Sequence, residues 1–323
     1  MPAMTASENS GQIKLQSSPR KPKTFWEKLA SQKQLVLMSV PLLVYIIIFA
    51  YVPLIGWVMA FQNYSPGQSL FHQEWVGWQQ FQYLFTEGDF LRVLRNTIAM
   101  SLINLVLGFI TSIGFALLLN EVRNLVIKKT IQTISYMPYF ISWVICAGIV
   151  STSFALDGVV NNVLVGMHLM NQPVQWLGIG KDFWGIFGIT NVWKNTGFNA
   201  IIYLGAMAGI DSALYEAADL DGASRWQKMR YITLPGIKST FVILLIMSVA
   251  GVLNAGFDLQ YLLGYGTNVA YSETIDVFAM KYGIDLGNYS LSTAAGMFKT
   301  VVSVILLLIA NGVSSKLGEE KLI

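Results

Sequence analysis

Very few side chains in this sequence are of the types that make or break covalent bonds. The only two histidines are His72 and His168, and the only cysteine is Cys146, which leaves little for a metal site or a nucleophile–base pair. The one Gly-Lys pair, Gly180-Lys181, is followed by aspartate and lacks the upstream glycine of a phosphate-binding loop. We therefore predict no catalytic residue, no bound metal and no ATP site on this chain.

A polar segment, residues 209–238, carries the most informative spacing in the sequence. Asp211 or Ser212 can begin a helix there, because their side chains accept hydrogen bonds from free backbone N–H groups. Gly222 can end that helix, because glycine tolerates a positive φ. Pro235, which has no backbone N–H, is tolerated in the first turn of the helix that follows. The segment is therefore predicted to hold a short helix just ahead of the entry to a longer one.

The side chains of this short helix suit contact with another protein. Ala217 and Ala218 would let its backbone lie close to a partner surface, and Glu216 and Arg225 are placed to pair with charges on that partner. The alternative is an amphipathic connecting helix that contacts no partner. Composition alone favours the connecting helix. The choice between the two interpretations therefore depends on the spacing of residues over the whole segment.

The elements on both sides of this segment are apolar enough to cross a membrane. Of 323 residues, 54% are hydrophobic and 12% are charged, with a mean hydropathy of +0.53, whereas soluble domains are about 25% charged. A span needs roughly 20 mostly apolar residues. Six windows qualify, near residues 35–61, 94–119, 131–153, 183–208, 238–263 and 291–313. We predict an all-α polytopic membrane protein with six transmembrane helices.

Lysine and arginine gather on one side of these windows. Fifteen of the 21 fall in the segments 1–34, 120–130, 209–238 and 314–323, and only three fall in the opposite loops. Because positively charged loops stay in the cytoplasm, both termini and the segment 209–238 are predicted to be cytoplasmic.

The sequence divides into a membrane domain and two cytoplasmic tails. Residues 1–34 are polar and end either in a short interfacial helix that carries Phe25 and Trp26 or in an unstructured basic stretch. Residues 35–313 form the membrane domain, and residues 314–323 form the second tail. The first apolar run is too long for a cleavable signal peptide, so it is predicted to remain as an anchor.

The spacing E-A-A-x3-G-x9-I-x-L-P, from Glu216 to Pro235, resembles the cytoplasmic coupling loop of permease subunits of binding-protein-dependent ABC importers. Other stretches resemble sugar-importer permeases of the maltose-permease type, over roughly residues 35–313. These stretches are Tyr51-Val52-Pro53, Ala60-Phe61, Trp75-Val76-Gly77, Phe81, Arg95-Asn96-Thr97, Met137-Pro138 and Asn161-Asn162. The similarity to this family thus extends over most of the chain.

The resemblance implies a permease of the type I ABC importer fold in a bacterial cell membrane, which forms half of an oligosaccharide pathway. Its partners would be a homologous second permease, two cytoplasmic ATPase subunits that hold ATP and Mg, an extracytoplasmic solute-binding protein and membrane lipid. No nucleic acid is expected. The residues that it assigns to ATPase coupling are Glu216, Ala217, Ala218, Gly222, Arg225, Leu234 and Pro235. The alternative is an ion- or proton-coupled carrier that acts alone, which would call for an intramembrane carboxylate relay.

Polar residues inside the apolar windows are candidates for the pathway, because ionisable groups there are costly and by default functional. Amides and aromatic rings suit a sugar, which has apolar ring faces and polar edges. The candidates are Lys194, Asn195, Asn199, Trp193, Asn254, Asp258 and Lys299, and Asn104 and Asn191 add further amides.

We hypothesise that Lys194, with Lys299 as a second candidate, faces a water-filled cavity that accepts an acidic oligosaccharide such as an alginate or pectin fragment. One alternative is that these groups only join helices together, or that Lys299 reaches toward the membrane interface. The other is a neutral sugar, with both lysines paired to Asp258.

Overall fold

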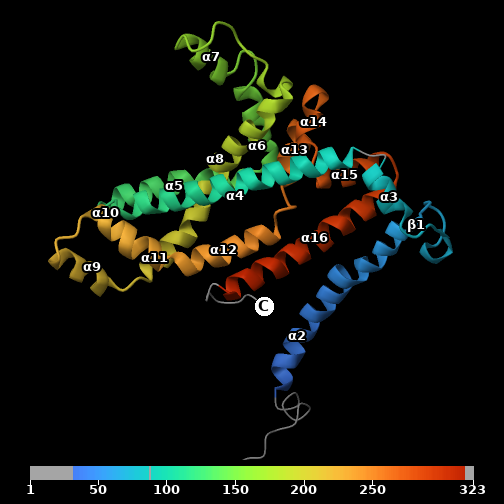
Figure 1. Ribbon diagram of the computed structural model, residues 1–323, viewed down its shortest axis with the longest axis horizontal. Coiled ribbons are helices and arrows are strands. Elements are labelled where there is room, and N and C mark those ends of the chain that lie inside the picture. The colour runs from blue at the N-terminus through green and yellow to red at the C-terminus, as the bar shows by residue number, and fades with distance from the viewer. Residues whose placement is uncertain (1–31, 87–88, 317–323) are drawn as a thin grey trace, which may run out of the picture. The chain divides into compact units, whose positions relative to one another are not determined.

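The computed structural model describes residues 32–86 and 89–316, without the side chains of residues 314 and 315 (Figure 1). The described chain is helical apart from two short strands. It divides into two compact units, residues 1–55 and 56–323, which are taken separately below. The interfacial helix expected around Trp26 lies outside the described residues, as does most of the C-terminal tail.

The first unit holds one apolar helix. Helix α2, Lys33–Ile46, continues through the π-helical turn η1, Ile47–Tyr51, into the 3-10 helix η2, Val52–Phe61. Together they form 29 residues of mean hydropathy 2.6, and none of the most apolar stretch is buried. A helix that is apolar on every face belongs in lipid or against other membrane helices.

The second unit begins within η2, at residue 56, continues with a small hairpin and then becomes helical. Strand β1, Gln62–Asn63, pairs antiparallel with β2, Glu74–Trp75, and Gln62 lies opposite Trp75. The helices that follow up to the polar segment are η3 (Leu70–His72), α3 (Gln79–Thr86), α4 (Phe90–Asn120), α5 (Leu125–Phe140), α6 (Trp143–Ser153), α7 (Val159–Gly166), η4 (Trp176–Gly178), η5 (Gly180–Asp182) and α8 (Phe183–Ala208).

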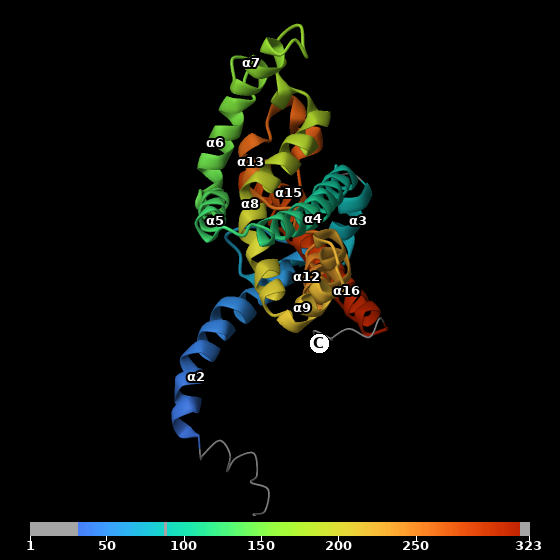
Figure 2. The same ribbon diagram turned by 90° about the vertical axis from the view of Figure 1, so that its left-hand side faces the viewer.

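The polar segment and the rest of the chain supply further helices. They are α9 (Ser212–Leu220), α10 (Arg225–Lys228), η6 (Met229–Thr233), α11 (Leu234–Gly236), α12 (Lys238–Ala250), α13 (Asp258–Leu263), η7 (Gly266–Asn268), α14 (Val269–Ser272), α15 (Ile275–Met280), η8 (Lys281–Asp285) and α16 (Tyr289–Lys316). Helix α8 packs against both α4 and α5, and Figure 2 shows it between them.

Three helices are long and apolar enough to cross a membrane unbroken, namely Lys33–Phe61, Phe90–Asn120 and Tyr289–Val313. The count rises to six when each of three sharply bent pairs is taken as one span. These pairs are Leu125–Phe140 with Trp143–Ser153 (99°), Gly180–Ala208 with Ser212–Leu220 (71°), and Arg225–Gly236 with Lys238–Ala250 (55°).

Two of the predicted windows are not continuous helices. The window 131–153 breaks after Phe140, close to Pro138, which removes a backbone donor from the last turn of α5. The window 238–263 breaks after Ala250, and Gly256 takes a φ of +99° before α13 begins. Apolar composition located these segments, but the structure sets other bounds, 125–153 and 225–250, and composition did not predict where the helices break.

The buried core of the second unit lies along α4 in three clusters. One joins the middle of α4 to α6, α8 and α13 through Phe183 and Phe187. A second joins its start to α15 and α16 through Phe90 and Phe278, whose rings meet at 5.6 Å. The third joins its end to α8 and to Ile237 at the start of α12. Helix α4 is therefore the element that the others pack around.

Candidate functional site

Helix α9 begins and ends at the residues that the sequence indicates. The Asp211 side chain accepts a hydrogen bond from the Ala213 N–H at 2.9 Å and caps the helix start. After the last helical residue, Leu220, Gly222 takes a φ of +72°, the left-handed conformation that favours glycine. Both predicted helix boundaries are confirmed.

The turn after α9 is a folded unit rather than a loose connection. Ser224 and Gln227 form a reciprocal capping box at the start of α10. The Lys228 ammonium lies 2.6 Å from an Asp219 carboxylate oxygen and joins α10 to α9. The Ser-x-x-Gln spacing of this box is visible in the sequence, and it was missed.

The surface of this unit is exposed, and it combines charged and apolar side chains. Glu216, Ala217 and Arg225 are exposed, and within the described residues Glu216 and Arg225 make no ion pair. Leu220 is 90% exposed and Trp226 is 64% exposed. Of the remaining predicted coupling residues, Ala218 is half-buried, whereas Gly222, Leu234 and Pro235 are exposed. Large apolar side chains that lie uncovered beside charges are typical of a surface that binds another protein.

A second polar region lies between α4, α8 and α12. Three adjoining hollows of about 200, 180 and 230 Å³ all include Asn104 of α4 in their lining. The first is lined by Asn191, Asn195 and Asn199 of α8. The third reaches Asn254 in the break after α12. The structure thus gathers the amides of three predicted spans around one residue.

Some of these amides are free to bind a ligand. The Asn191 amide donates to the Phe187 carbonyl at 2.9 Å, and the Asn195 amide donates to Asn191 at 3.3 Å. Within the described residues, the side chains of Asn104, Asn199 and Asn254 make no hydrogen bond. Each amide side chain offers donors as well as an acceptor, which suits a cargo that is rich in hydroxyl groups.

Lys194 does not face a cavity as hypothesised. Its side chain is buried, at 4% exposure, and its ammonium donates to the carbonyl oxygens of Pro138 at 3.1 Å and Tyr139 at 2.9 Å, and also to that of Ile141. The ammonium also lies 4.9 Å from the centre of the Trp143 ring. Three backbone oxygens therefore take the place of the water or cargo that an unpaired lysine would need.

The other expected pathway residues are dispersed. Lys299 lies 2.5 Å from a carboxylate oxygen of Asp276 in α15, so its partner is not Asp258. Asp258 is exposed at the start of α13, and Trp193 is exposed on α8. None of these three lines the amide-rich hollows. The partners of Lys194 and Lys299 both lie far from these lysines in the sequence. Residue spacing along one helix therefore could not reveal them.

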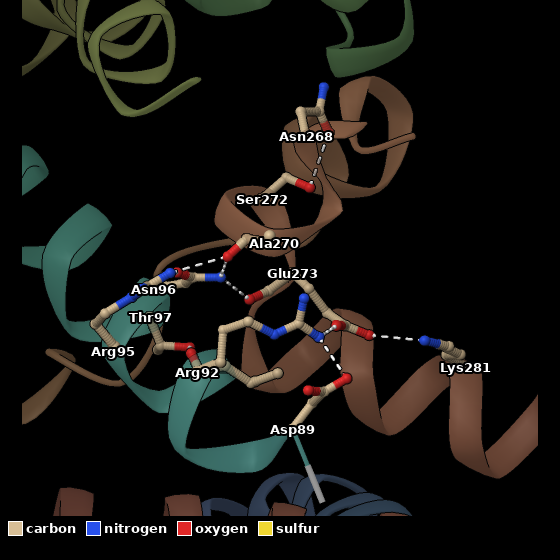
Figure 3. Close-up of polar contacts among 11 residues, drawn as sticks. Asp89, Arg92, Arg95, Asn96, Thr97, Asn268, Ala270, Ser272, Glu273 and Lys281 are labelled. Atoms are coloured by element: carbon tan, nitrogen blue, oxygen red, sulfur yellow. Dashed lines mark hydrogen bonds and ion pairs between the residues drawn. The ribbon is translucent and has the colours of Figure 1, made fainter. Parts of the chain in front are cut away.

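A cluster of ion pairs around the buried Glu273 carboxylate holds the start of α4, and sequence reasoning missed it (Figure 3). The Glu273 carboxylate is 2% exposed and lies 2.8 Å from Arg92 and 3.2 Å from Lys281. Arg92 also lies 2.8 Å from the Asp89 carboxylate, at the end of α4 remote from α9. The one buried charge in the cluster, Glu273, thus has two cationic partners, as burial of a charge requires.

The Arg95-Asn96-Thr97 stretch explains how the segment before α15 is held to α4 (Figure 3). The Asn96 amide donates to the carbonyls of Ala270 and Glu273, both at 3.1 Å, and the Ile275 N–H donates to the Thr97 hydroxyl at 3.0 Å. These three residues drew attention in the sequence only through a resemblance. Their contacts assign them a structural role at this end of α4.

No arrangement for metal chemistry appears in residues 32–86 and 89–316, where no three His, Cys, Asp or Glu side chains gather closely enough to hold an ion.

Residues 104–318 match the family described as binding-protein-dependent transport system inner membrane component. The polygalacturonan/rhamnogalacturonan transport system permease protein YteP of Bacillus subtilis is 41% identical over 297 residues, which cover 91% of each chain. Protein LplB of the same organism is 40% identical over 295 residues, which cover 91% of this chain and 92% of LplB.

Two solved structures are similar over nearly the whole chain. One is a bacterial ABC transporter involved in the import of the acidic polysaccharide alginate, with 37% identity, a TM-score of 0.83 and coverage of 90% of this chain and 98% of the other. The second is a bacterial alginate ABC transporter in complex with an alginate pentasaccharide-bound periplasmic protein, with 36% identity, a TM-score of 0.85 and coverage of 93% and 100%.

These similarities favour an importer subunit over a carrier that acts alone. In such importers the ATPase is a separate subunit, so this chain is a multi-pass membrane transport component and not an enzyme. The chain belongs to the family of inner-membrane permease components of binding-protein-dependent ABC transport systems.

Proposed function

We propose that this chain forms half of the pathway of an oligosaccharide importer and is driven through α9 by a cytoplasmic ATPase. A homologous second permease would complete the pathway, two ATPase subunits would bind ATP and Mg, and an extracytoplasmic solute-binding protein would deliver the cargo. The observation that carries the proposal is the exposed, well-capped α9 unit, whose apolar and charged side chains find no cover within the described residues.

The coupling contact is assigned to the exposed side of α9 and its flanks. Glu216 and Ala217 would face the ATPase, with Ala218 close behind them, and Arg225 would pair with an acidic group. Gly222 sets the turn after α9, and Leu234 and Pro235 set the entry to α12. The alanines allow close approach of the two backbones because their side chains are short.

The membrane topology that fits this role has the six predicted spans, near residues 35–61, 94–119, 131–153, 183–208, 238–263 and 291–313, with α9 outside the membrane and both termini cytoplasmic. The excess of lysine and arginine in the segments 1–34, 120–130, 209–238 and 314–323 supports this orientation. In this orientation α9 would lie in the cytoplasm, where ATP is available, and the ion cluster around Glu273 would lie toward the opposite face.

The three hollows around Asn104 are this chain's share of the pathway. Asn195, Asn199 and Asn254 remain pathway residues, and Asn104 and Asn191 join them. Lys194 and Lys299 do not, because both are held by groups of the protein itself.

The cargo that we favour is an acidic oligosaccharide. The permease YteP is described as a polygalacturonan/rhamnogalacturonan transport protein, and the two similar structures are alginate importers. Carboxylates and hydroxyls of a uronate chain would be bound by the amides of the wall, which carry no net charge.

Reconstitution of the whole importer tests this function. ATP hydrolysis by the purified assembly should rise when the binding protein carries a galacturonate or alginate oligosaccharide, and it should stay low with a neutral oligosaccharide of equal length. Failure of this chain to purify with an ATPase subunit, or hydrolysis that ignores the loaded binding protein, would contradict the proposal.

A further inference from the structure

The break between α5 and α6 exposes carbonyl groups that need partners. Helix α5 ends at Phe140, and α6 begins at Trp143 after a bend of 99°. The last four carbonyls of any helix lack intrahelical donors. In an apolar segment, water cannot supply those donors, so the protein itself has to do so.

Lys194 of α8 supplies donors to two of them and to the carbonyl that follows the helix. Its ammonium has three N–H donors and meets the carbonyls of Pro138 and Tyr139 in the last turn of α5 and that of Ile141 just beyond it. The Pro138 carbonyl also accepts from the Ile141 N–H at 3.2 Å. The positive charge sits at the C-terminal end of α5, where the helix dipole is negative. The Trp143 ring, at the first position of α6, faces the same ammonium at 4.9 Å. One side chain thus bonds to the last turn of one helix and contacts the first residue of the next.

The neighbouring positions make the same junction rigid. One turn beyond Lys194, Gly197 packs so closely that an added Cβ would clash with the backbone carbonyl of Ser135 in α5. The rings of Phe198 and Tyr139 are stacked at 3.8 Å with 5° between their planes. Helices α5 and α8 therefore meet along a seam with little space for sliding.

The other face of α8 carries the pathway. Asn191, Asn195 and Asn199 line the hollow beside α4, and the end of α8 leads directly through Gly209 to Asp211, the cap of α9. The seam thus joins the helix break, the amide wall and the coupling helix in one continuous element.

We propose that Lys194 is a positioning residue for transport, which fixes the α5–α6 bend to α8 so that a movement of α9 carries the wall and α6 together. This role rests on the proposed coupling function. It differs from recognition of an acidic cargo, because Lys194 contacts no hollow.

Two matched substitutions test the role. Lys194→Met keeps the length of the side chain but has no donor and no charge, whereas Lys194→Arg keeps both. Spin labels at Ile149 of α6 and Ile189 of α8, which are 43% and 63% exposed, would report the distance between the helices in the complete importer. Cys146→Ala removes the native cysteine from the background.

We expect a broadened distance distribution in Lys194→Met and a distribution like that of the parent in Lys194→Arg. The maximal transport rate of Lys194→Met should fall roughly tenfold or more, because the carbonyls of Tyr139 and Ile141 lose the Lys194 donor. The concentration of loaded binding protein that gives a half-maximal rate should change less than about twofold. The ratio of the transport rates of acidic and neutral cargo should not change.

Lys299→Met is the control, because it removes a lysine that is paired to Asp276 outside this seam. Its distance distribution should match that of the parent. If Lys194→Met does not assemble, Lys194→Gln, with two amide donors, should show intermediate broadening.

A parent-like distance in Lys194→Met, or a shifted cargo ratio, would overturn the positioning role. Loss of receptor-stimulated hydrolysis in the parent would instead overturn the proposed function, and the distance measurement would still decide the role of Lys194.

Discussion

The α9 unit follows the end of α8 and the Lys194 seam lies near the middle of that helix, and the two regions differ in how their side chains find partners. In the α9 unit, Asp211, Ser224 and Lys228 bond to groups within nine residues of themselves, and the outward side chains stay uncovered. In the seam, Lys194 bonds to carbonyls 53 to 56 residues away and is fully enclosed. The first region is built to contact something outside the chain, and the second is built to hold the chain together.

The largest effect on transport is expected from a substitution at Gly222, in the turn after α9. Gly222→Ile would force a β-branched residue to a φ of +72°, which costs on the order of 1–3 kcal/mol and tilts the exposed surface of α9. We expect cargo uptake to fall about tenfold to hundredfold, while the amount of protein in the membrane stays unchanged. Uptake measured in membrane vesicles would show it.

The matched control for Gly222 is Gly67→Ile. Gly67 also has a positive φ, +100°, with no atom near its missing Cβ, but it lies in the loop between β1 and β2. The Gly67→Ile variant should take up cargo at the rate of the parent. Equal uptake by the Gly222 and Gly67 variants would remove the special role of the α9 turn.

The difference between buried and exposed ion pairs can be measured at Glu273 and Asp219. Glu273→Gln removes a carboxylate that is 2% exposed and contacts Arg92 and Lys281, and loss of a buried charge that has two partners costs more than loss of an exposed pair. Asp219→Asn breaks an exposed pair, worth about 0–1 kcal/mol. Thermal unfolding of the purified importer should therefore shift strongly only for Glu273→Gln, and equal shifts would refute the distinction.

Substitutions at two glycines of α8 test how tightly α5 and α8 pack along the seam. Gly197→Ala places a methyl group against the Ser135 carbonyl, and we expect a loss of about 1–3 kcal/mol from overpacking. Gly205→Ala meets open space and should stabilise the helix by up to about 1 kcal/mol. Chemical denaturation would separate the two. If Gly197→Ala left the free energy of unfolding unchanged, α5 and α8 could separate at this position without loss of stability.

The smallest effect is expected at the wall. Asn104→Leu keeps the size of the side chain but removes the amide that lies in all three hollows. A lost hydrogen bond to a neutral cargo group is worth about 0.5–1.5 kcal/mol, so transport should slow by roughly two- to tenfold with unchanged thermal stability. If Asn104→Leu transported like the parent, the conclusion that Asn104 lines the pathway would be wrong.

Local patterns in the sequence predicted what is local in the structure. The window 183–208 coincides with α8, and Asp211 and Gly222 begin and end α9 as expected. A capping residue acts on N–H groups two or three positions away, so its effect can be inferred without knowledge of the fold.

The errors concern partners that only the fold brings near. Lys194 and Lys299 were read as cavity charges because their carbonyl and carboxylate partners lie on other helices. The breaks after Phe140 and Ala250 were missed for another reason. Pro138 and Gly256 lie near these breaks, but hydropathy does not record how a backbone bends at such residues.

Crosslinking from α9 tests the central claim most directly. With Ala217→Cys in a Cys146→Ala background, a short thiol-reactive crosslinker should join this chain to the ATP-hydrolysing subunit of the assembled importer, with a yield that changes on addition of ATP. Leu169→Cys, which is exposed but lies between α7 and α8, should give no such product. An Ala217→Cys variant that never reaches the ATPase, in membranes that still transport, would contradict the account.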